Sequence, residues 1–430
     1  MRRYESYKDS GVEWLGKIPS QWELTIGMNV FRENKRDNKG MKEKTVLSLS
    51  YGQIIIKPEE KLVGLVPESF ETYQIVEPND IIIRCTDLQN DKTSLRTGLA
   101  KDKGIITSAY LNLKVINNHS AKFLHYYLHT LDITKVLYKF GSGLRQNLSF
   151  LDFKRLPIID IPLSEQQKIA QFLDEKTAKI DQAVDLAEKQ IALLKEHKQI
   201  LIQNAVIRGL NPDVPLKDSG VEWIGQVPEH WEVKKLKYLA KLSPSKSEIT
   251  CNHEESCSFI PMEKLKLNTL VLDEIKQIKN VYSAYTYFRD EDLLIAKVTP
   301  CFENKNFAIA KNLVNSIGFG SSEIYVLRTY NNLLNKFLFY RLQEQNFMEI
   351  AISKMSGTGG LKRVPSEFIN NFQLALPPFC EQQKIADYLD KQTAKIDQAI
   401  ALKTAHIEKL KEYKSVLIND VVTGKVRVSV

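Results

Sequence analysis

The sequence predicts two mixed α/β domains in tandem, each followed by one long helix. Two repeated segments support this. KDSGVEWLGKIPSQWEL at residues 8–24 returns as KDSGVEWIGQVPEHWEV at residues 217–233. EQQKIAQFLDEKTAKIDQAV at residues 165–184 returns as EQQKIADYLDKQTAKIDQAI at residues 381–400. Because each copy returns after about half of the 430 residues, the whole chain is a repeat whose units are each long enough for a domain.

Composition indicates an ordinary globular protein. The chain is 43% hydrophobic, which is enough to bury normal cores. No run approaches the roughly 20 apolar residues of a membrane span, and the N-terminus lacks the apolar core of a signal peptide. The five cysteines form no CxxC pair, and their odd number argues against a disulfide framework. We therefore expect a reducing, cytoplasmic setting without membrane contact.

The positive charge is concentrated in two matching blocks. Residues 23–163 hold 20 Lys and Arg against 16 Asp and Glu, and residues 232–379 hold 19 against 15. The rest of the chain is balanced, so these blocks carry the whole net charge of +8. A mild excess of this kind suits contact with a polyanion.

A long helix is expected after each block. Ser164 is a good N-cap residue, Gln167 completes a capping-box pattern, and Gly209 marks the end. Apolar or small residues follow heptad spacing and include two polar positions: Leu173, Thr177, Ile180, Val184, Ala187, Ile191, Leu194, Lys198 and Leu201. The second copy matches this seam as far as Gly424, with Lys403 in place of Ala187. Because the two seams match so closely, the simplest arrangement is that the two helices pair with each other. The alternative is that each helix packs on the domain that precedes it.

The two blocks share a faint α/β skeleton despite little identity. An acidic turn and a short apolar strand occur at residues 77–87 and 289–299, and an alternating strand at 107–115 and 321–329. A short amphipathic helix follows at 121–130 and 335–343. Gly-rich loops carrying Arg and Lys then occur at residues 141–147 and 356–363. One frame with two different surfaces suits two related binders of different targets.

The Gly-rich loops and the neighbouring strand ends are the candidate DNA-binding sites. Glycine lets the backbone approach phosphates, Arg and Lys neutralise them, and Gln146 and Asn147 can read adenine edges. The alternative is that these loops are simply tight turns. The predicted DNA-contacting residues are Arg84, Thr86, Arg96, Ser108, Tyr110, Ser142, Arg145, Gln146, Asn147, Lys297, Thr299, Lys305, Ser321, Ser322, Thr358, Lys362 and Arg363.

Familiar catalytic motifs are missing. There is no P-loop, no G-x-G-x-x-G after a strand, no amino-methyltransferase motif and no set of acids with a Lys typical of a nuclease. His125 and His129 stand at i, i+4 without a third ligand, so a helix face touching solvent is the simpler interpretation. Cys251, His253 and Cys257 form only a weak metal candidate. We expect no catalytic residue, cofactor site or metal site on this chain.

The repeated motifs resemble those of specificity subunits of type I restriction–modification systems. The resemblance rests on S-G-V-E-W-[LI]-G-x-[IV]-P-x-x-W-E at residues 10–23 and 219–232 and on E-Q-Q-K-I-A with its A-K-I-D-Q-A continuation. It covers essentially the whole chain. Such subunits carry two target-recognition domains that each read half of a bipartite site in double-stranded DNA, held apart by two antiparallel helices. Two methylation subunits, which bind S-adenosylmethionine, and restriction subunits, which use ATP and Mg²⁺, are the implied partners.

The resemblance also implies a division of the chain and a role for the repeated segment. Placed beside the end of the second helix, the first segment would close a pseudo-two-fold arrangement. The tryptophans Trp14, Trp22, Trp223 and Trp231 would then be packing aromatics of this joint, the rival being base stacking. The expected parts are a joint segment (1–22), target-recognition domain 1 (23–163), a helix (164–209), a second joint (210–231), target-recognition domain 2 (232–379) and a second helix (380–430).

Two other function classes remain as alternatives. A single-chain methyltransferase or nuclease is disfavoured by the missing motifs. A coiled-coil scaffold with two protein-binding heads is disfavoured by the placement of the excess charge. DNA binding in the presence of a methylation partner would separate the recognition subunit from the scaffold.

Overall fold

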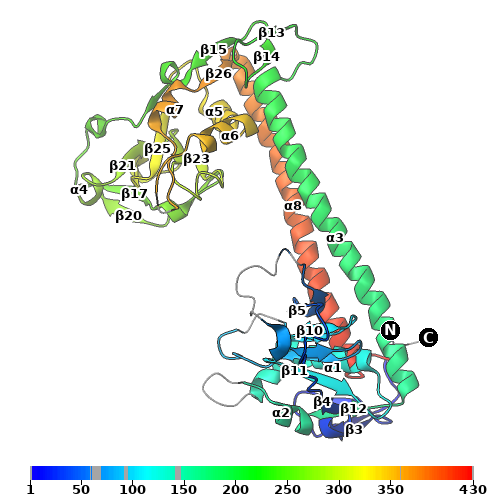
Figure 1. Cartoon of the computed structure of the whole chain (residues 1–430). Coiled ribbons are helices and arrows are strands. Elements are labelled where there is room, and N and C mark those ends of the chain that lie inside the picture. The colour runs from blue at the N-terminus through cyan, green and yellow to red at the C-terminus, as the bar shows by residue number, and fades with distance from the viewer. Residues whose placement is uncertain are drawn as a thin grey trace. The chain divides into compact units, whose positions relative to one another are not determined.

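The structure is a computed structural model that describes residues 2–58, 60, 69–91, 95–140, 147–358 and 360–428. The chain divides into two compact units (Figure 1). Unit 1 comprises Met1–Glu188 and Ala405–Val430, and unit 2 comprises Lys189–Thr404. Each unit therefore contains one head and half of each of two long helices, α3 (Leu163–Arg208) and α8 (Phe379–Val422).

The head of unit 1 is built on an antiparallel sheet in the order β4-β11-β8-β9, with α1 packed against it. The central strand β8 is fully buried at three positions because both faces of the sheet are covered. The elements of this head are β1 (Tyr7–Asp9), β2 (Lys17–Pro19), β3 (Glu23–Ile26), β4 (Phe31–Glu33), β5 (Leu47–Ser50), β6 (Gln53–Ile56), β7 (Gln74–Val76), β8 (Ile81–Arg84), β9 (Thr97–Leu99), β10 (Gly104–Ile106), β11 (Tyr110–Val115), α1 (Ala121–Ile133), α2 (Phe150–Arg155) and β12 (Pro157–Asp160).

The head of unit 2 repeats this plan with β16-β25-β22-β23 and adds a sheet β20-β17-β24-β21 in which β17 and β24 are parallel. Its elements are β13 (Leu216–Asp218), β14 (Gln226–Pro228), β15 (Glu232–Lys235), β16 (Ala240–Leu242), β17 (Ser256–Ile260), β18 (Leu265–Lys266), β19 (Thr269–Leu270), β20 (Ile275–Gln277), α4 (Ile278–Val281), β21 (Thr286–Arg289), β22 (Leu293–Ala296), β23 (Phe307–Ile309), β24 (Ile317–Gly320), β25 (Ile324–Thr329), α5 (Asn335–Arg341), α6 (Gln345–Ser353), α7 (Ser366–Asn371) and β26 (Gln373–Leu376).

The two heads share one register as well as one strand order. Ile83 lies opposite Leu111 in the first sheet, and Ile295 lies opposite Tyr325 in the second. The predicted skeleton of strand, strand and helix is confirmed in both heads. Shared register also lets positions of one head be matched to positions of the other.

The two long helices form as predicted, with one correction at the start. Helix α3 begins at Leu163, so Ser164 lies in the first turn and is not the N-cap; the carbonyl of Pro162 accepts the first helical bonds. Both helices end before a glycine in the left-handed region, Gly209 and Gly424 (φ 77° and 76°).

The heptad seam is buried or half-buried along both helices, as expected for paired helices. Within unit 2, Lys198 Nζ lies 2.7 Å from both carboxylate oxygens of Asp397. Within unit 1, Lys414 Nζ makes the same pair of 2.7 Å contacts with Asp181. Partner numbers run in opposite directions, so the helices are antiparallel. The seam lysines Lys198 and Lys414 thus pair with acids of the other helix.

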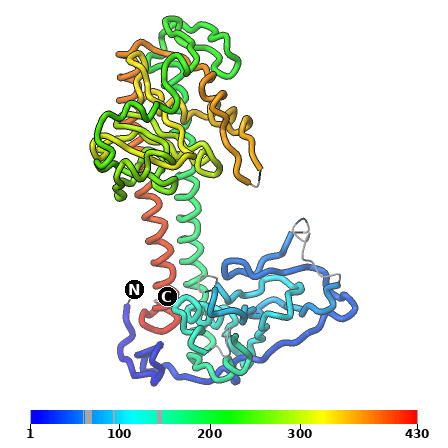
Figure 2. Tube along the Cα trace, turned by 90° about the vertical axis from the view of Figure 1, so that its left-hand side faces the viewer, coloured from blue at the N-terminus to red at the C-terminus, as the bar shows by residue number. Residues whose placement is uncertain are grey.

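The repeated segment is a joint at the end of a long helix. In unit 1 the hydroxyl of Tyr7 donates to the carbonyl of Gly424. The backbones of Arg2 and Arg427 form an antiparallel β-bridge, which brings the two ends of the chain together (Figure 2). A Cβ on Gly424 would meet Trp22 at 2.7 Å, and one on Gly209 would meet Trp231 at 3.2 Å. The first segment therefore occupies beside α8 the place that the second occupies beside α3.

The joint tryptophans are packing residues. Trp22 and Trp231 are completely buried, and Trp14 and Trp223 pack on the two large cores. The Trp22 indole donates to Glu165 at 3.2 Å, and Trp231 donates to Glu381 at the same distance. The base-stacking alternative does not fit the buried pair. The Glu of each E-Q-Q motif is explained by this bond.

The next polar residues of the repeated helical motif fasten each head to its helix. Asp174 accepts from Lys122 and Tyr126 of α1 at 2.7 and 2.8 Å. Asp390 accepts from the equivalent Lys336 and Tyr340 of α5 at 2.6 and 2.7 Å. The same clamp in both units explains why this part of the motif is repeated.

Candidate nucleic-acid interface

The end of the central strand is hydrogen-bonded in the same way in both heads to the residue that follows the Gly-rich loop. Leu148 N donates to Cys85 O at 2.9 Å in unit 1, and Val364 N donates to Lys297 O at 2.9 Å in unit 2. The residue before each donor, Asn147 or Arg363, is exposed. We call these two places recognition edge 1 (residues 84–91, 107–110 and 147) and recognition edge 2 (residues 297–299, 321–323, 356–358 and 360–363).

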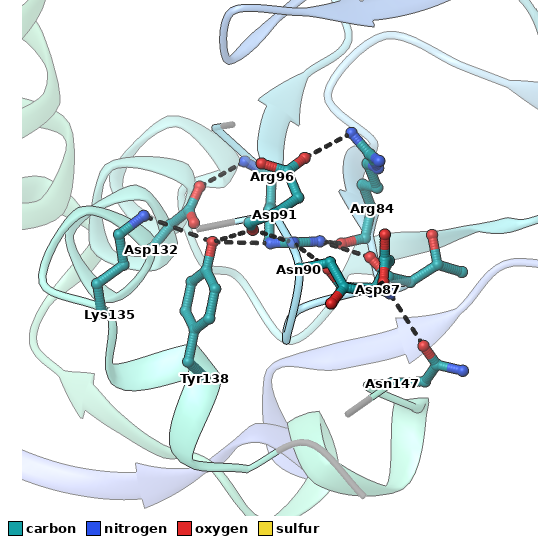
Figure 3. A network of polar contacts seen from close by, with 10 residues as sticks. Arg84, Asp87, Asn90, Asp91, Arg96, Asp132, Lys135, Tyr138 and Asn147 are labelled. Atoms are coloured by element: carbon teal, nitrogen blue, oxygen red, sulfur yellow. Dashed lines mark hydrogen bonds and ion pairs between the residues drawn. The ribbon is translucent and has the colours of Figure 1, made fainter. Parts of the chain in front are cut away.

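Arg96 organises recognition edge 1 through its side chain (Figure 3). Its guanidinium donates to four backbone carbonyls of the 84–91 loop and to Tyr138. The four acceptors lie 3.3, 2.7, 3.1 and 2.6 Å away and are Arg84 O, Thr86 O, Asp87 O and Asp91 O. Since Arg96 itself is 0% exposed, it fixes the shape of the loop from inside the head.

The prediction that Arg96 contacts DNA directly does not fit its buried position. A buried guanidinium needs partners for its donors, and backbone carbonyls supply them here. Its backbone N also donates to the Asp132 carboxylate at 2.5 Å. The positive charge of Arg96 therefore holds the 84–91 loop in place.

Other predicted residues of the first head do lie at the surface of recognition edge 1. Arg84 is half-buried, and its guanidinium lies 3.1 Å from Asp91. Thr86 and Ser108 are exposed, and Tyr110 lies opposite Arg84 in the sheet. The Asn147 side chain accepts from Asp87 N at 3.0 Å, which ties the Gly-rich loop to the strand end (Figure 3).

Three predicted residues fall outside the described residues. They are Ser142, Arg145 and Gln146. Their contact with DNA stays a prediction.

Recognition edge 2 gathers seven of the predicted residues of the second head. Thr299 N donates to Lys362 O at 3.0 Å, and Lys362 N donates to the Thr299 hydroxyl at 3.1 Å. Lys297 lies 5.3 Å over the ring of Tyr325. Thr358 and Lys362 are exposed. The Arg363 guanidinium faces Glu323, with Nε and Nη2 at 2.8 and 3.0 Å from its two oxygens.

Two serines complete recognition edge 2. Ser322 is exposed, and the Ser321 hydroxyl accepts from Glu323 N at 3.2 Å, shaping the turn before β25. Sequence reasoning missed Glu323. The signal was the difference between Ala109 and Glu323 at matched positions of TSAYLNLKV and SSEIYVLRT.

Lys305 faces inward rather than toward recognition edge 2. Its ammonium donates to Gln343 O at 2.7 Å and to the Gln199 side chain of α3 at 2.8 Å. Burial, with the neighbouring Lys198, lowers the pKa of Lys305 to about 8. The ammonium thus links the head to the helix, so the prediction of a DNA contact does not fit this position.

An open hollow in unit 2 adds cations that sequence reasoning did not single out. It is lined by Lys241, Arg289 and Arg328, together with Glu248 and Tyr330. Arg328 makes a bidentate pair with the buried Asp292 and also contacts Glu248. These acids neutralise much of the positive charge, so the hollow is a polar surface more than an anion site.

The possible metal ligands of the described residues do not gather into one cluster. No group of three or more His, Cys, Asp or Glu among them is placed to hold an ion. Burial is the main cause that lowers the pKa of His125 to about 4 and of His129 to about 3, so both are neutral near pH 7. No helix in the described part of the chain is long and apolar enough to cross a membrane.

These features define a two-headed binding protein with paired helices. The sequence matches the family of type I restriction modification DNA specificity domains over residues 29–196 and 228–412. Since these two regions cover most of the chain, it belongs to that family. Solved structures agree on the fold. A chain of a type I R-M system complex aligns at TM-score 0.67 and 16% identity, covering 95% of this chain and 99% of that one. The HsdS subunit from Thermoanaerobacter tengcongensis aligns at TM-score 0.54, 16% identity and coverages of 95% and 98%.

Three curated relatives are specificity subunits by name. The Escherichia coli EcoAI subunit is 38% identical over 37% of this chain and 27% of its own length. The EcoEI subunit of the same species is 30% identical over 49% and 36%. The putative MjaX subunit of Methanocaldococcus jannaschii is 23% identical over 96% of both chains. The matched segments thus span only about a third of the two E. coli relatives.

Proposed function

We propose that this chain is the non-catalytic DNA-specificity subunit of a type I restriction–modification complex. Each head reads one half of a bipartite site in double-stranded DNA. The paired helices set the spacing of the halves and carry the partner subunits. Methylation with S-adenosylmethionine and restriction with ATP and Mg²⁺ take place on those partners.

The observation that carries the proposal is that the two heads share one backbone arrangement but present different side chains at matched surface positions. Recognition edges 1 and 2 share their strand register and their strand-to-loop hydrogen bond. Their surface residues differ, since the exposed Asn147 matches the exposed Arg363 and the exposed Ala109 matches the half-buried Glu323. A scaffold that bound the same partner twice would need matching surfaces, whereas a reader of two different half-sites needs different ones.

The surface of the helices supports the docking of partners. Leu193 and Ile200 stand seven residues apart on α3 and are 63% and 50% exposed, and Leu402 of α8 is 65% exposed. Apolar side chains at heptad spacing outside the seam are typical of a helix surface that another helix covers. We assign this surface, in unit 2, to a methylation subunit.

Co-expression with a methylation subunit tests the proposal. The expected product is a complex of one copy of this chain with two copies of the partner, measured by native mass spectrometry. Genomic DNA exposed to the complex should carry methylated bases at one two-part motif, mapped by long-read sequencing. A second complex with residues 23–163 exchanged for those of a relative should change one half of the motif. A motif without two separable halves would refute the two-reader proposal.

A further inference from the structure

Glu323 and Arg363 form an ion pair where the matched positions of the first head, Ala109 and Asn147, are uncharged. The register of the sheets matches Glu323 with Ala109, and the bonds to Cys85 O and Lys297 O match Arg363 with Asn147. The frame around these positions is the same in both heads, yet a neutral pair stands in one and an acid with a base in the other. The difference therefore belongs to the surface and not to the fold.

The pair is held in a defined geometry. Arg363 presents Nε and Nη2 to the two oxygens of Glu323 at 2.8 and 3.0 Å. The backbone of Arg363 is fixed on both sides, since it bridges Val298 and Ser356. The preceding residue is tied to Thr299 by two hydrogen bonds. Both side chains thus project from rigid backbone while remaining 47% and 28% exposed.

The stability of the fold does not explain why this ion pair is present. An ion pair open to solvent contributes little to folding. The bond to Arg363, helped by nearby Lys297, lowers the pKa of Glu323, so the carboxylate is charged at neutral pH. A fixed negative charge on a DNA-binding edge repels phosphates. It is favourable only where a base presents an amino group to it.

We propose that Glu323 and Arg363 act together as a specificity-determining pair that reads one G·C base pair in the major groove. Arg363 donates to O6 and N7 of guanine, and Glu323 accepts from N4 of cytosine. A guanidinium has five donors and a carboxylate about four acceptor sites, so the mutual bidentate contact leaves both groups capacity for a base. The proposal rests on the proposed function and adds the residues and the base pair to it.

The complementarity has a geometric basis. In the major groove guanine offers two acceptors and its partner cytosine offers one donor, side by side. Arg363 and Glu323 offer donors and an acceptor side by side. A T·A pair would set a methyl group and carbonyl against one of them, leaving buried polar groups without partners.

The test uses the complex with the methylation subunit and a library of duplexes. In each duplex one position of the mapped motif is changed to each other base pair, and the methylation rate is measured. The wild type should require G·C at one position of one half-site. Glu323→Gln and Arg363→Lys should each lower discrimination at that same position by roughly tenfold or more. The other half-site should be unchanged.

The matched control is Glu254→Gln, which removes the acid of another exposed ion pair of the same head, with Lys279 at 2.6 Å. It should leave every preference unchanged. Complex assembly is checked for each variant, and Arg363→Lys keeps the charge should Glu323→Gln fail to assemble.

The outcomes separate this inference from the proposed function. Full discrimination in both variants, or a loss spread over both half-sites or over different positions, overturns the inference while a two-part motif still supports the proposed function. A wild-type complex without any two-part motif overturns the proposed function itself.

Discussion

At the scale of single residues, Arg96 sets the shape of a surface that it does not reach. Its side chain serves four backbone carbonyls of the 84–91 loop. Those carbonyls and the buried guanidinium satisfy each other, so neither is left without a partner. The exposed side chains of recognition edge 1 depend on that arrangement.

Arg96→Ala should therefore destabilise unit 1 by on the order of 3 kcal/mol, because several buried carbonyls lose their donor. Urea denaturation of the full chain measures the change. Arg84→Ala is the control, since it removes a half-buried guanidinium of the same loop and should cost less than about 1 kcal/mol. Equal losses in the two variants would contradict this account of Arg96.

Two histidines of α1 predict a pH dependence. Nε2 of His125 and Nδ1 of His129 are buried without a hydrogen-bond partner among the described residues. Burial is the first cause of their lowered pKa values of about 4 and about 3. The other causes act less. A backbone hydrogen bond with Thr97 and the charge of Asp174 raise the pKa of His125, and Lys101 lowers it. His125 and Lys414 lower the pKa of His129. The prediction that these histidines lie on a helix face touching solvent is therefore corrected: these two ring nitrogens are buried.

The sign follows from the unfolded chain, in which histidine titrates near 6.5. Between about pH 6.5 and pH 4 the unfolded state binds more protons, so stability falls as pH is lowered through this window. Above pH 6.5 the effect is absent. His125→Phe, which copies the Phe339 of the matched position in unit 2, should flatten the loss. The melting temperature of the variant and the wild type between pH 4.5 and pH 7.5 gives the comparison.

At the scale of elements, the polar seam residues explain the direction of the paired helices. The Lys198 side chain is 15% exposed and that of Asp397 is 56% exposed, so the protein shields this ion pair only partly from water. Lys198→Asp should cost about 1 kcal/mol because it sets two acids together. Combining it with Asp397→Lys should restore most of that. A double-mutant cycle by thermal denaturation measures the coupling, and additive losses would show that the pair does not orient the helices.

The elements were also the most predictable part of the molecule. Heptad spacing, the closing glycines and two copies of each motif located the helices and joints, because these signals are local or repeated. The burial of Arg96, the inward turn of Lys305 and the Glu323–Arg363 pair were not predictable. Each depends on residues brought together by the fold, and a charged residue reads the same in a sequence whether its partner is a carbonyl or a solvent molecule.

At the scale of the whole molecule, the paired helices should act as a ruler for the DNA site. Inserting four residues between Ala187 and Glu188, and four between Lys403 and Thr404, lengthens each helix by about 6 Å. The preferred gap between half-sites should grow by about one to two base pairs. Four residues exceed one helical turn only slightly, so the seam rotates little.

Methylation of a library with fixed half-sites and varied gaps measures the outcome. The same four residues inserted after Pro212, an exposed loop position, should leave the gap unchanged. A variant that still methylates at the original gap, with both helices lengthened, would refute the ruler.

The first joint packs against Gly424, and the backbones of Arg2 and Arg427 form a β-bridge. These contacts have a consequence for the order of the parts along the chain. Within each unit the joint lies at the end of a long helix, and only in unit 2 does a continuous stretch of chain connect that helix to the joint. Circular permutation therefore comes at little cost: a short linker from residue 428 to residue 2, with a new start after Pro212, would leave the packing of every part intact. The packing of each joint thus depends on its place beside the end of a helix and not on which joint comes first in the chain.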